Sequence, residues 1–272
     1  MNYTMGFIGT GNMGGALARA AAKAAVGDKI YLSNKTREKA ERLAAELGCK
    51  AVTVEEAAKC GYVFLGVKPQ MMGDLLAQIA PVLASRQDDF VLVSMAAGIT
   101  MADIQKMAGG NYPVIRIMPN TPVAVGSGVI LYDATENVSA QVLAQFCQIM
   151  QFAGLVDHLP EKLIDAGSAV AGCGPAFAAL FMEALEDGGV SCGLPRQKAR
   201  QYAQQMLMGT AQLALETGKH PGQMKDEVCS PGGSTIAGVQ ELEEGALRAS
   251  VIRAVQASYS KNKELGKVSN KL

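Results

Sequence analysis

The feature that most constrains the fold is a glycine motif that directly follows an apolar run near the start of the chain. Tyr3 to Ile8 is apolar, Gly9-Thr-Gly11-Asn-Met-Gly14 is the motif, and Ala16 to Ala25 has the composition of a helix. A strand, G-x-G-x-x-G and a helix in this order are typical of a dinucleotide-binding sheet, in which the glycines permit a tight turn, close approach of a diphosphate and close helix–strand packing. The sequence therefore predicts an N-terminal Rossmann-type α/β domain, and the residues expected at the diphosphate are Gly9, Gly11, Asn12, Met13 and Gly14.

The end of the second predicted strand, Lys29 to Ser33, indicates which dinucleotide is bound. An NAD site usually places Asp or Glu there to hold the ribose hydroxyls. Here the chain continues Asn34-Lys35-Thr36-Arg37, with no acid and two cations. Hydroxyl, amide and cationic groups suit a ribose phosphate, so NADPH is expected to be preferred, with NADH also usable, and the expected ligands are Ser33, Asn34, Lys35 and Arg37. A solvated turn in which Thr36 caps the following helix, 37–47, is the alternative, and both can hold together.

Three later strands end in loops that suit a flat nicotinamide ring. The predicted strands 62–67, 90–94 and 114–118 are mostly apolar, as expected of strands buried on both faces. Open α/β sheets bind ligands at the carboxyl ends of their strands. The loops there carry small, amide or proline residues without an acid, and the cofactor contacts expected from them are Val67, Lys68, Pro69, Ala96, Ala97 and Asn120. The alternatives are that Lys68 is a solvated cation and Asn120 an ordinary turn residue.

The pattern of elements changes near Pro160. Before it, strands near 50–52, 128–132 and 155–158 and helices at 55–58 and 138–153 complete an alternating β/α half. After it, only helical stretches follow, at 161–170, 175–188 and 196–217, with two more beyond Ser230. Such a change predicts two domains, a Rossmann-like domain over 1–160 and an all-helical domain over 161–272. The small-residue helices of the second are expected to complete their core on another subunit.

The helical half contains one stretch with the chemistry of an anion site, Ser230-Pro-Gly-Gly-Ser-Thr235. The proline and glycines prevent a regular approach, and a helical pattern begins at Ser234 or Thr235. The first amides of a helix have no carbonyl partners and point outward with the positive end of the helix dipole behind them, which suits a carboxylate or phosphate. The alternative is a plain Pro-Gly-Gly turn capped by Ser or Thr.

Composition excludes several other classes of protein. Acidic and basic residues are equal in number, 25 each, and no long run of either sign occurs, which argues against nucleic acid or an anionic membrane as partner.

The stretch 167–182 is uncharged but rich in Gly, Ala and Ser and interrupted at 172–175, so we expect it to be buried between subunits, not in lipid. The scattered cysteines predict no metal site and indicate free thiols in a reducing cytoplasm; they are Cys49, Cys60, Cys147, Cys173, Cys192 and Cys229. No signal peptide is expected, because the apolar start runs into the glycine motif.

These motifs together resemble one family, pyrroline-5-carboxylate reductase, over essentially the whole chain. Phe7-Ile-Gly-x-Gly-Asn-Met13, Val67-Lys-Pro69, Ala96-Ala-Gly98 and Arg116-Ile-Met-Pro-Asn-Thr-Pro122 are similar to its N-terminal and middle motifs. The most specific match is Ser230 to Thr235, continuing to Ile236 and Gly238. One departure is visible: many members have an asparagine where this chain has Val54-Glu55-Glu56. The departure leaves open whether this loop contacts the adenosine ribose, and it does not affect the reaction that the resemblance implies.

The resemblance implies a reaction and an assembly. It implies reduction of the cyclic imine 1-pyrroline-5-carboxylate to L-proline by NAD(P)H, the last step of proline biosynthesis, by a homodimer or a decamer built from dimers. Thr235 resembles the threonine whose hydroxyl lies beside the substrate nitrogen, and the amides of Gly233, Ser234 and Thr235 would hold the substrate carboxylate. The expected substrate-binding residues are Ser230, Gly232, Gly233, Ser234 and Thr235.

Two other functions are weighed against this one. A reductase of similar build that acts on β-hydroxyacids relies on a lysine and an asparagine on the first interdomain helix, and the stretch 172–182 has neither. An NADP-binding sensor without catalysis would leave the cofactor unoxidised in the presence of the imine. No histidine is assigned a catalytic role, because an iminium can take its proton from water.

Overall fold

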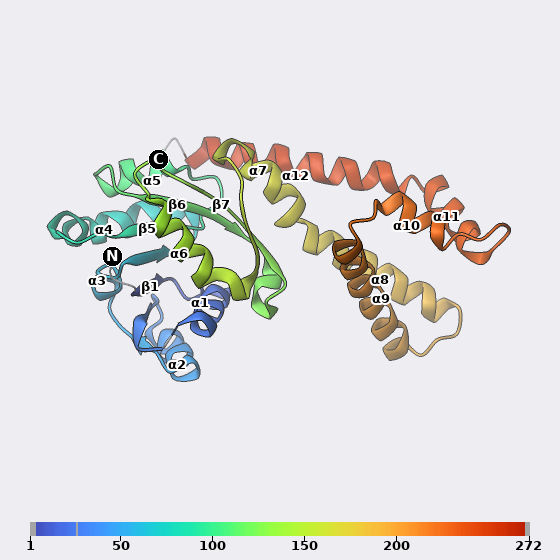
Figure 1. Cartoon of the computed structure of the whole chain (residues 1–272), viewed down its shortest axis with the longest axis horizontal. Coiled ribbons are helices and arrows are strands. Elements are labelled where there is room, and N and C mark those ends of the chain that lie inside the picture. Colours follow the sequence, from blue (N-terminus) through green and yellow to red (C-terminus); the bar gives the residue numbers. More distant parts are fainter. Residues whose placement is uncertain (1–3, 26, 270–272) are drawn as a thin grey trace. The chain divides into compact units, whose positions relative to one another are not determined.

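The computed structural model describes residues 4–25 and 27–269 and divides into two compact units (Figure 1). The first unit comprises residues 1–173 together with 258–272, and the second comprises 174–257. Tyr3, the first residue of the predicted N-terminal strand, and residues 270–272 of the predicted second domain lie outside the described residues. An α/β unit followed by helices confirms the predicted fold class.

The first unit is built on an eight-stranded sheet with the order β3-β2-β1-β4-β5-β6-β7-β8. Neighbouring strands are parallel except β6 and β7, which pair antiparallel. The chain lays β2 and β3 on one side of β1 and then crosses over to β4 on the other side, so the switch point at which such sheets bind ligands lies at β1. The strands are β1 (Met5–Ile8), β2 (Ile30–Ser33), β3 (Lys50–Ala51), β4 (Tyr62–Leu65), β5 (Val91–Ser94), β6 (Val114–Pro119), β7 (Gly128–Ala134) and β8 (Gly154–His158).

Helices cover both faces of this sheet because successive side chains of its central strands point alternately into two apolar cores, one on each face. Phe7 and Phe64 belong to one core, where their rings stack with centroids 4.2 Å apart, while Val63 and Leu65 belong to the other. The first core also contains buried residues of α1, α2 and α6, and the second those of α4 and α5. The helices of this unit are α1 (Asn12–Ala24), α2 (Arg37–Leu47), α3 (Val54–Ala57), α4 (Met72–Ser85), α5 (Met101–Ala108), α6 (Ala140–Met150) and α7 (Glu161–Ala171), with 3-10 turns η1 (Gly27–Lys29), η2 (Pro69–Met71), η3 (Thr121–Val125) and η4 (Gln151–Ala153).

The second unit is helical and has little interior of its own. Its helices are α8 (Gly174–Ser191), α9 (Arg196–Thr217), α10 (Pro221–Glu227), α11 (Ser234–Glu244) and α12 (Leu247–Ser269), the last of which returns to the first unit at residue 258. Among its described residues only Glu186, Ala199 and Ala203 are buried. Glu186 joins α8 to α9 through ion pairs with Arg196 (3.2 Å) and Arg200 (2.9 Å), and the Arg200 guanidinium, then Arg196, lowers the pKa of its carboxyl.

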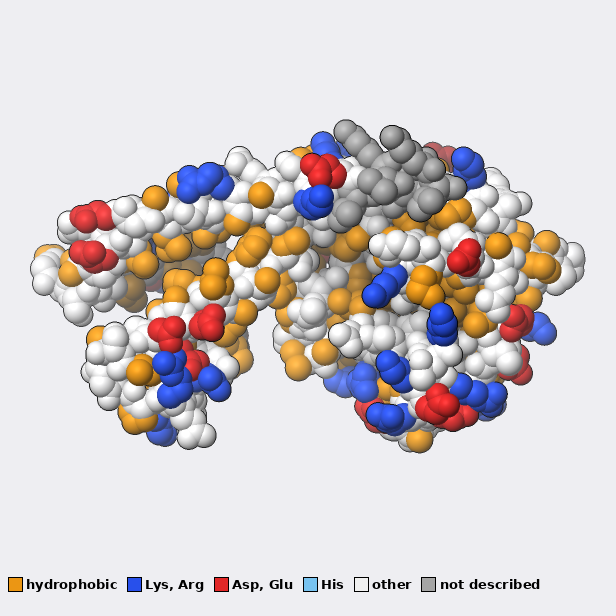
Figure 2. All heavy atoms as spheres, turned by 180° about the vertical axis from the view of Figure 1, so that it is seen from behind, with side chains coloured by type: hydrophobic (Ala, Val, Ile, Leu, Met, Phe, Trp, Pro, Cys, Tyr) orange, Lys and Arg blue, Asp and Glu red, His pale blue; other side chains and the backbone are white. Residues whose placement is uncertain are grey.

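Large apolar side chains lie on the surface of these helices instead (Figure 2). Leu215 is 86% exposed and Leu180 67%. Soluble monomers seldom expose so many large apolar side chains, which mark an interaction surface when they are numerous. The exposed set in this unit is Leu180, Leu194, Tyr202, Met206, Met208, Leu213, Leu215, Val228, Ile236, Leu242, Val251 and Ile252.

The uncharged stretch 167–182 is divided between the two units. In the first unit a side chain at Gly167 would overlap Leu131 of β7, and Ser168 and Ala169 are buried. In the second unit Leu180 is exposed. The segment from Glu161 to Ser191 is long and apolar enough to cross a membrane by length and composition, with a mean hydropathy of 1.4 in its most apolar window. Its burial between subunits stays a prediction.

The limits of the elements differ little from those expected. Helix α9 has the predicted bounds, whereas the helix expected over 138–153 is shorter and ends in the 3-10 turn η4. Its N-cap is Ser139, whose hydroxyl accepts from the Val142 amide (3.3 Å). The compact units divide after residue 173 and not after 160, because α7 packs on the sheet. The functional division at residue 160 stays a prediction.

Candidate active site

The dinucleotide-binding half of the site starts from one row of paired residues across the sheet. Ile8 of β1 is in register with Ser33 of β2 and with Leu65 of β4. Leu65 is in register with Ser94 of β5, and Ser94 with Arg116 of β6. The loops that follow β1, β2, β4 and β5 therefore leave the sheet side by side at one edge, as the sequence analysis expected of parallel strand ends.

The glycine loop after β1 has the geometry of a diphosphate cradle. Gly9 has φ of +98°, and a Cβ there would lie 2.6 Å from the carbonyl group of Gly66 at the end of β4. A Cβ on Gly14 would overlap the Gly9 carbonyl oxygen, so this glycine permits the close approach of α1 to β1. At Gly11, by contrast, a Cβ would meet nothing within 4 Å. Gly11 is also the N-cap of α1 and caps it with no side chain, so the first amides of the helix, which begins at Asn12, are open to an anion.

These observations fit a bound dinucleotide. The space in front of Gly11 and the uncapped helix behind it are what a diphosphate requires, and no acid stands in the first turn of α1. Asn12 is exposed and Met13 half-buried beside the same loop. Gly66 was missed by the sequence analysis, although Val67, which follows it, was named. Its close contact with Gly9 requires a glycine at each of these positions.

The β2–α2 turn is tied to the glycine loop by Asn34. The Asn34 Oδ1 accepts a hydrogen bond from the Thr10 amide (3.1 Å), and its Nδ2 donates to the Thr36 carbonyl (3.1 Å). Ser33 is buried at the end of β2, and its carbonyl accepts from the Gly9 amide (2.8 Å). Asn34 therefore shapes the turn that was expected to surround a ribose phosphate. Its own contact with a phosphate stays a prediction.

The two cations of this turn are exposed. Lys35 has no ion pair among the described residues, whereas Arg37 pairs with Glu41 one helical turn later (2.8 Å). That hydrogen bond and charge raise the pKa of Arg37. Thr36 is the N-cap of α2, as expected, but its side chain makes no capping hydrogen bond. The turn is thus not a side-chain-capped turn, and both cations lie in solvent where a phosphate can reach them.

The loops after β4, β5 and β6 differ in which of their side chains are exposed and which are held by hydrogen bonds within the protein. Lys68 is exposed before the 3-10 turn η2, and Ala97 is exposed beside buried Ala96. Asn120 is buried and fully used by the protein, since its Oδ1 accepts from the Val129 amide (2.8 Å) and its Nδ2 donates to the Ala171 carbonyl (3.0 Å). Its main-chain amide and carbonyl are paired as well, with the Val129 carbonyl and the Val123 amide (3.2 Å each), so its contact with the cofactor stays a prediction. Val67 and Pro69 are half-buried in the same row of loops.

The loop that lacks the family's asparagine is a capped helix start. Thr53 and Glu56 form a capping box at the start of α3, with the Thr53 amide donating to the Glu56 carboxylate (2.8 Å). Glu55 accepts from the Gln78 amide group (2.8 Å). Both acids are thus held by protein groups of the first unit.

In the second unit, Ser230 to Thr235 forms a turn and an uncapped helix start. The Gly233 amide donates to the Ser230 carbonyl (3.0 Å), and Gly232 between them has φ of +69°, the conformation that a type II turn requires of a glycine. Helix α11 begins at Ser234 with Gly233 as its N-cap and with no side-chain capping hydrogen bond. The turn is therefore not capped by Ser or Thr.

This geometry changes one of the expected contacts. The Gly233 amide is already used in the turn, so the helix amides that remain without a preceding carbonyl begin at Ser234 and Thr235. Both side chains are exposed, and within the described part of the chain neither hydroxyl hydrogen-bonds to a protein group. Ser230 is exposed as well. The tip of α11 thus offers the amides of Ser234, Thr235 and Ile236, a helix dipole and two free hydroxyls to an anion.

Comparison with known proteins identifies both units. Residues 161–265 match the family model described as pyrroline-5-carboxylate reductase dimerisation, and residues 4–98 match the one described as NADP oxidoreductase, coenzyme F420-dependent. The chain is 38% identical to a pyrroline-5-carboxylate reductase of Pisum sativum, covering 97% of this chain and 96% of that protein. It is 35% identical to that of Escherichia coli, covering 98% and 100%.

Solved structures agree over the whole length. A pyrroline carboxylate reductase of Plasmodium falciparum with NADP bound has a TM-score of 0.86 at 30% identity, covering 97% of this chain and 98% of that one. A pyrroline-5-carboxylate reductase of Coxiella burnetii has a TM-score of 0.89 at 30% identity, covering 97% and 99%.

Proposed function

The chain belongs to the pyrroline-5-carboxylate reductase family, and we propose that it reduces 1-pyrroline-5-carboxylate to L-proline with a hydride from NADPH. The observation that carries the proposal is the tip of α11. There the amides without helical partners and the Thr235 hydroxyl suit the carboxylate and the ring nitrogen of a small cyclic imino acid. The same chain carries a dinucleotide cradle in its other unit.

The cofactor-binding residues would hold and orient the dinucleotide, which itself supplies the reacting group. NADPH, when bound, supplies a hydride from its nicotinamide ring. The open backbone at Gly11 and the amides of α1 would take the diphosphate, and Lys35 and Arg37 the ribose phosphate. The nicotinamide would lie against the loops that follow β4 and β5, at Val67, Lys68, Pro69, Ala96 and Ala97. The finding that supports NADP over NAD is the absence of an acid after Ser33.

The tip of α11 would bind and orient the substrate. The Ser234 and Thr235 amides would hold the carboxylate, because the helix dipole favours a negative charge there. The Thr235 hydroxyl would accept a hydrogen bond from the protonated ring nitrogen and keep the imine carbon in one orientation. The product nitrogen needs no protein acid, since the iminium already carries its proton. Ser230, Gly232 and Gly233 would act by forming the turn.

The proposal is tested by following the absorbance of NADPH and of NADH on addition of racemic 1-pyrroline-5-carboxylate. Oxidation that depends on the imine, with L-proline as product, is the expected result. A protein that binds NADPH but does not oxidise it in the presence of the imine would be a sensor and not this enzyme.

NADPH preference is expected to depend on Lys35 and Arg37. Replacing both by alanine removes charge-assisted hydrogen bonds to the ribose phosphate, so the Kd for NADPH should rise roughly 10- to 100-fold while that for NADH changes little. Replacement of Lys39 and Arg42, which removes the same two charges from later in α2, is the matched control. The measurement is a fluorescence titration with each cofactor. A wild-type protein that uses NADH tenfold better at saturating imine would contradict this preference.

We further propose that the protein is a homodimer through its helical part, 161–272, or a decamer built from such dimers. The exposed apolar side chains of α8 to α12 support this assembly, as does the dimerisation family over 161–265. Light scattering on detergent-free protein should give the mass of a dimer or of a multiple of it. A stable and active monomer would rule out the assembly.

The proposed location of the protein is the cytoplasm. All six cysteines are free thiols, which supports a location in a reducing cytoplasm.

A further inference from the structure

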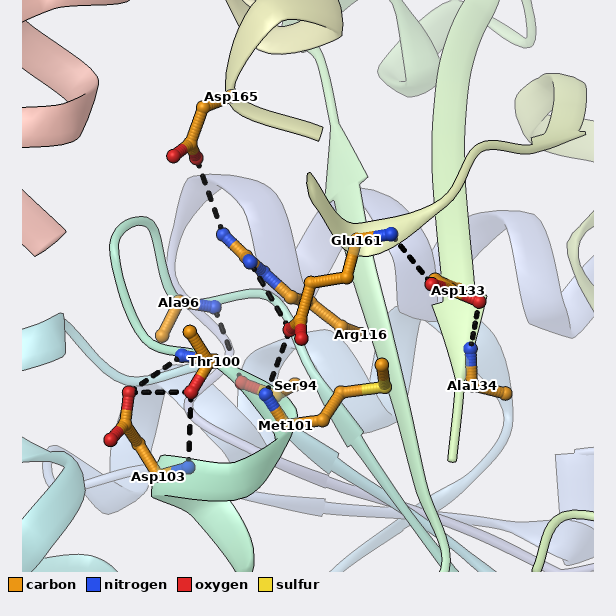
Figure 3. A network of polar contacts seen from close by, with 10 residues as sticks. All are labelled: Ser94, Ala96, Thr100, Met101, Asp103, Arg116, Asp133, Ala134, Glu161 and Asp165. Atoms are coloured by element: carbon orange, nitrogen blue, oxygen red, sulfur yellow. Dashed lines mark hydrogen bonds and ion pairs between the residues drawn. The ribbon is translucent and has the colours of Figure 1, made fainter. Parts of the chain in front are cut away.

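Arg116 is a buried cation in a strand that is otherwise apolar. Its neighbours Ile115 and Ile117 point into the first core, so Arg116 lies on the opposite face of β6. Its side chain is only 4% exposed, and its two terminal nitrogens contact the carboxylates of Glu161 (3.2 Å) and Asp165 (3.4 Å) (Figure 3). Both acids belong to α7, and Arg116 is the cation they contact in the described part of the chain.

Glu161 extends this contact to the loop after β5. The Oε1 atom that pairs with Arg116 also accepts a hydrogen bond from the Met101 amide (2.8 Å) at the start of α5 (Figure 3). Thr100 and Asp103 cap that helix start, with the Thr100 amide donating to the Asp103 carboxylate (3.1 Å). The carboxylate of Glu161 thus joins β6, α7 and α5 at one atom.

The loop Ala96–Gly98 is therefore held at both ends by residues linked to Arg116. At its start Ser94 is in register with Arg116 in the sheet, and the Ser94 hydroxyl faces the Ala96 amide (3.4 Å). At its end Met101 is held through Glu161. This is one of the loops against which the nicotinamide would lie. Of the network's residues (Figure 3), only Ala96 was expected at the site from the sequence.

We propose that Arg116 is a positioning residue for hydride transfer, acting through Glu161 to fix the Ala96–Gly98 loop under the nicotinamide ring. The proposal rests on the proposed function of the chain. A guanidinium is required because its planar fork reaches both carboxylates at once, which a lysine ammonium at the end of a flexible stem does not reproduce. Loss of the fork would leave the loop free to shift, and small shifts of bound reactants cost large factors in rate.

The experiment compares Arg116→Met, Arg116→Lys and Glu161→Ala with Arg86→Met as matched control. Arg86 is equally buried, at 5% exposure, and pairs with Asp88 (2.7 Å), but it lies at the amino ends of the strands, where it donates to the carbonyls of Ala58 and Cys60 (2.8 Å each). For each variant, kcat and KM for the imine, the Kd for NADPH and the thermal midpoint are measured. Kinetics are run well below the lowest midpoint of the set.

Arg116→Met and Glu161→Ala should lower kcat roughly 10- to 100-fold, and Arg116→Lys should lie between them and the wild type. The Kd for NADPH should stay within about twofold, because the diphosphate and ribose-phosphate contacts are made elsewhere. Arg86→Met should lower the thermal midpoint and leave kcat unchanged. Should Arg116→Met fail to fold, Glu161→Ala decides, because it leaves Arg116 paired with Asp165.

Two outcomes would overturn the proposal. One is a wild-type kcat in Glu161→Ala, or in a folded Arg116→Met. The other is an equal loss of kcat in Arg86→Met, which would make the effect one of general stability. Failure of the proposed function is distinguishable from both, since it would be visible as a wild-type protein that does not reduce the imine.

Discussion

Replacing Thr235 by valine should lower kcat by about five- to 150-fold and leave the Kd for NADPH near the wild-type value. Valine keeps the shape of threonine and removes one hydrogen bond to the substrate nitrogen, which corresponds to roughly 1–3 kcal/mol of transition-state stabilisation. Thr235→Ala should behave in the same way. The cofactor is unaffected because its contacts come from the first unit. Thr235→Ser, which keeps the hydroxyl, is the control and should retain most of the activity.

Gly233→Val should have a larger effect than either. A Cβ at Gly233 would lie 2.6 Å from the Ser230 hydroxyl oxygen and 3.1 Å from the Ser230 carbonyl oxygen. The Ser230 side chain must therefore rotate and its carbonyl shift, and the branched side chain of valine needs more room still in the turn before α11. The amides of Ser234 and Thr235 would then no longer point toward the substrate carboxylate. L-proline, which shares the carboxylate and the ring, should inhibit competitively against the imine and bind more weakly to this variant. Full activity and unchanged inhibition by proline in Thr235→Val and Thr235→Ala would mean that the stretch is only a turn and that the substrate binds elsewhere.

The second large effect is expected from two alanine substitutions in the glycine loop that add the same methyl group in different places. Gly14→Ala places it against the Gly9 carbonyl oxygen, where backbone must move, so the free energy of unfolding should fall by about 1–3 kcal/mol or more. Gly11→Ala places it in open space at a φ of −69°, which alanine adopts readily. Its effect on stability should be small, about that of an N-cap change.

The order should reverse for cofactor binding. The methyl group of Gly11→Ala occupies the space expected for the diphosphate, so the Kd for NADPH should rise about tenfold or more, a cost of at least ~1.4 kcal/mol. Denaturant unfolding and NADPH titration on both variants check the pair. A Gly11→Ala protein that binds NADPH like the wild type would show that the diphosphate does not lie at this loop.

The parts of the fold that could be predicted are those that depend on the order of residues within a short segment. The glycine loop, the buried strands and the bounds of α9 follow from glycine spacing, apolar runs and helical periodicity. Helix α4 is not among the predicted elements, although Met72, Leu75, Leu76 and Ile79 repeat at helical spacing. The structure accommodates Pro81 within this helix. Helices α5 and α10 are short and were also not placed.

The parts of the site that could not be predicted depend on contacts between distant segments. Arg116 stands out in the sequence as a cation within an apolar strand, and such a residue must be paired if buried. Nothing in the sequence indicates that its partners are Glu161 and Asp165, which lie in α7. Likewise, nothing in the sequence indicates that both ends of the Asn34 amide hydrogen-bond to backbone, of the glycine loop and of its own turn. Its contact with a phosphate stays a prediction.

The most direct test of the central claim is isotope transfer from NADPH deuterated at C4 of the nicotinamide. Incubation with 1-pyrroline-5-carboxylate should give L-proline with one deuterium on the former imine carbon, the ring carbon next to nitrogen that does not carry the carboxylate. The deuterium should be transferred from only one of the two faces of the nicotinamide ring. Thr235→Val should form the same labelled product more slowly. Proline without deuterium whichever face of the nicotinamide carries the label, or no proline at all while the labelled cofactor stays reduced, would contradict the account.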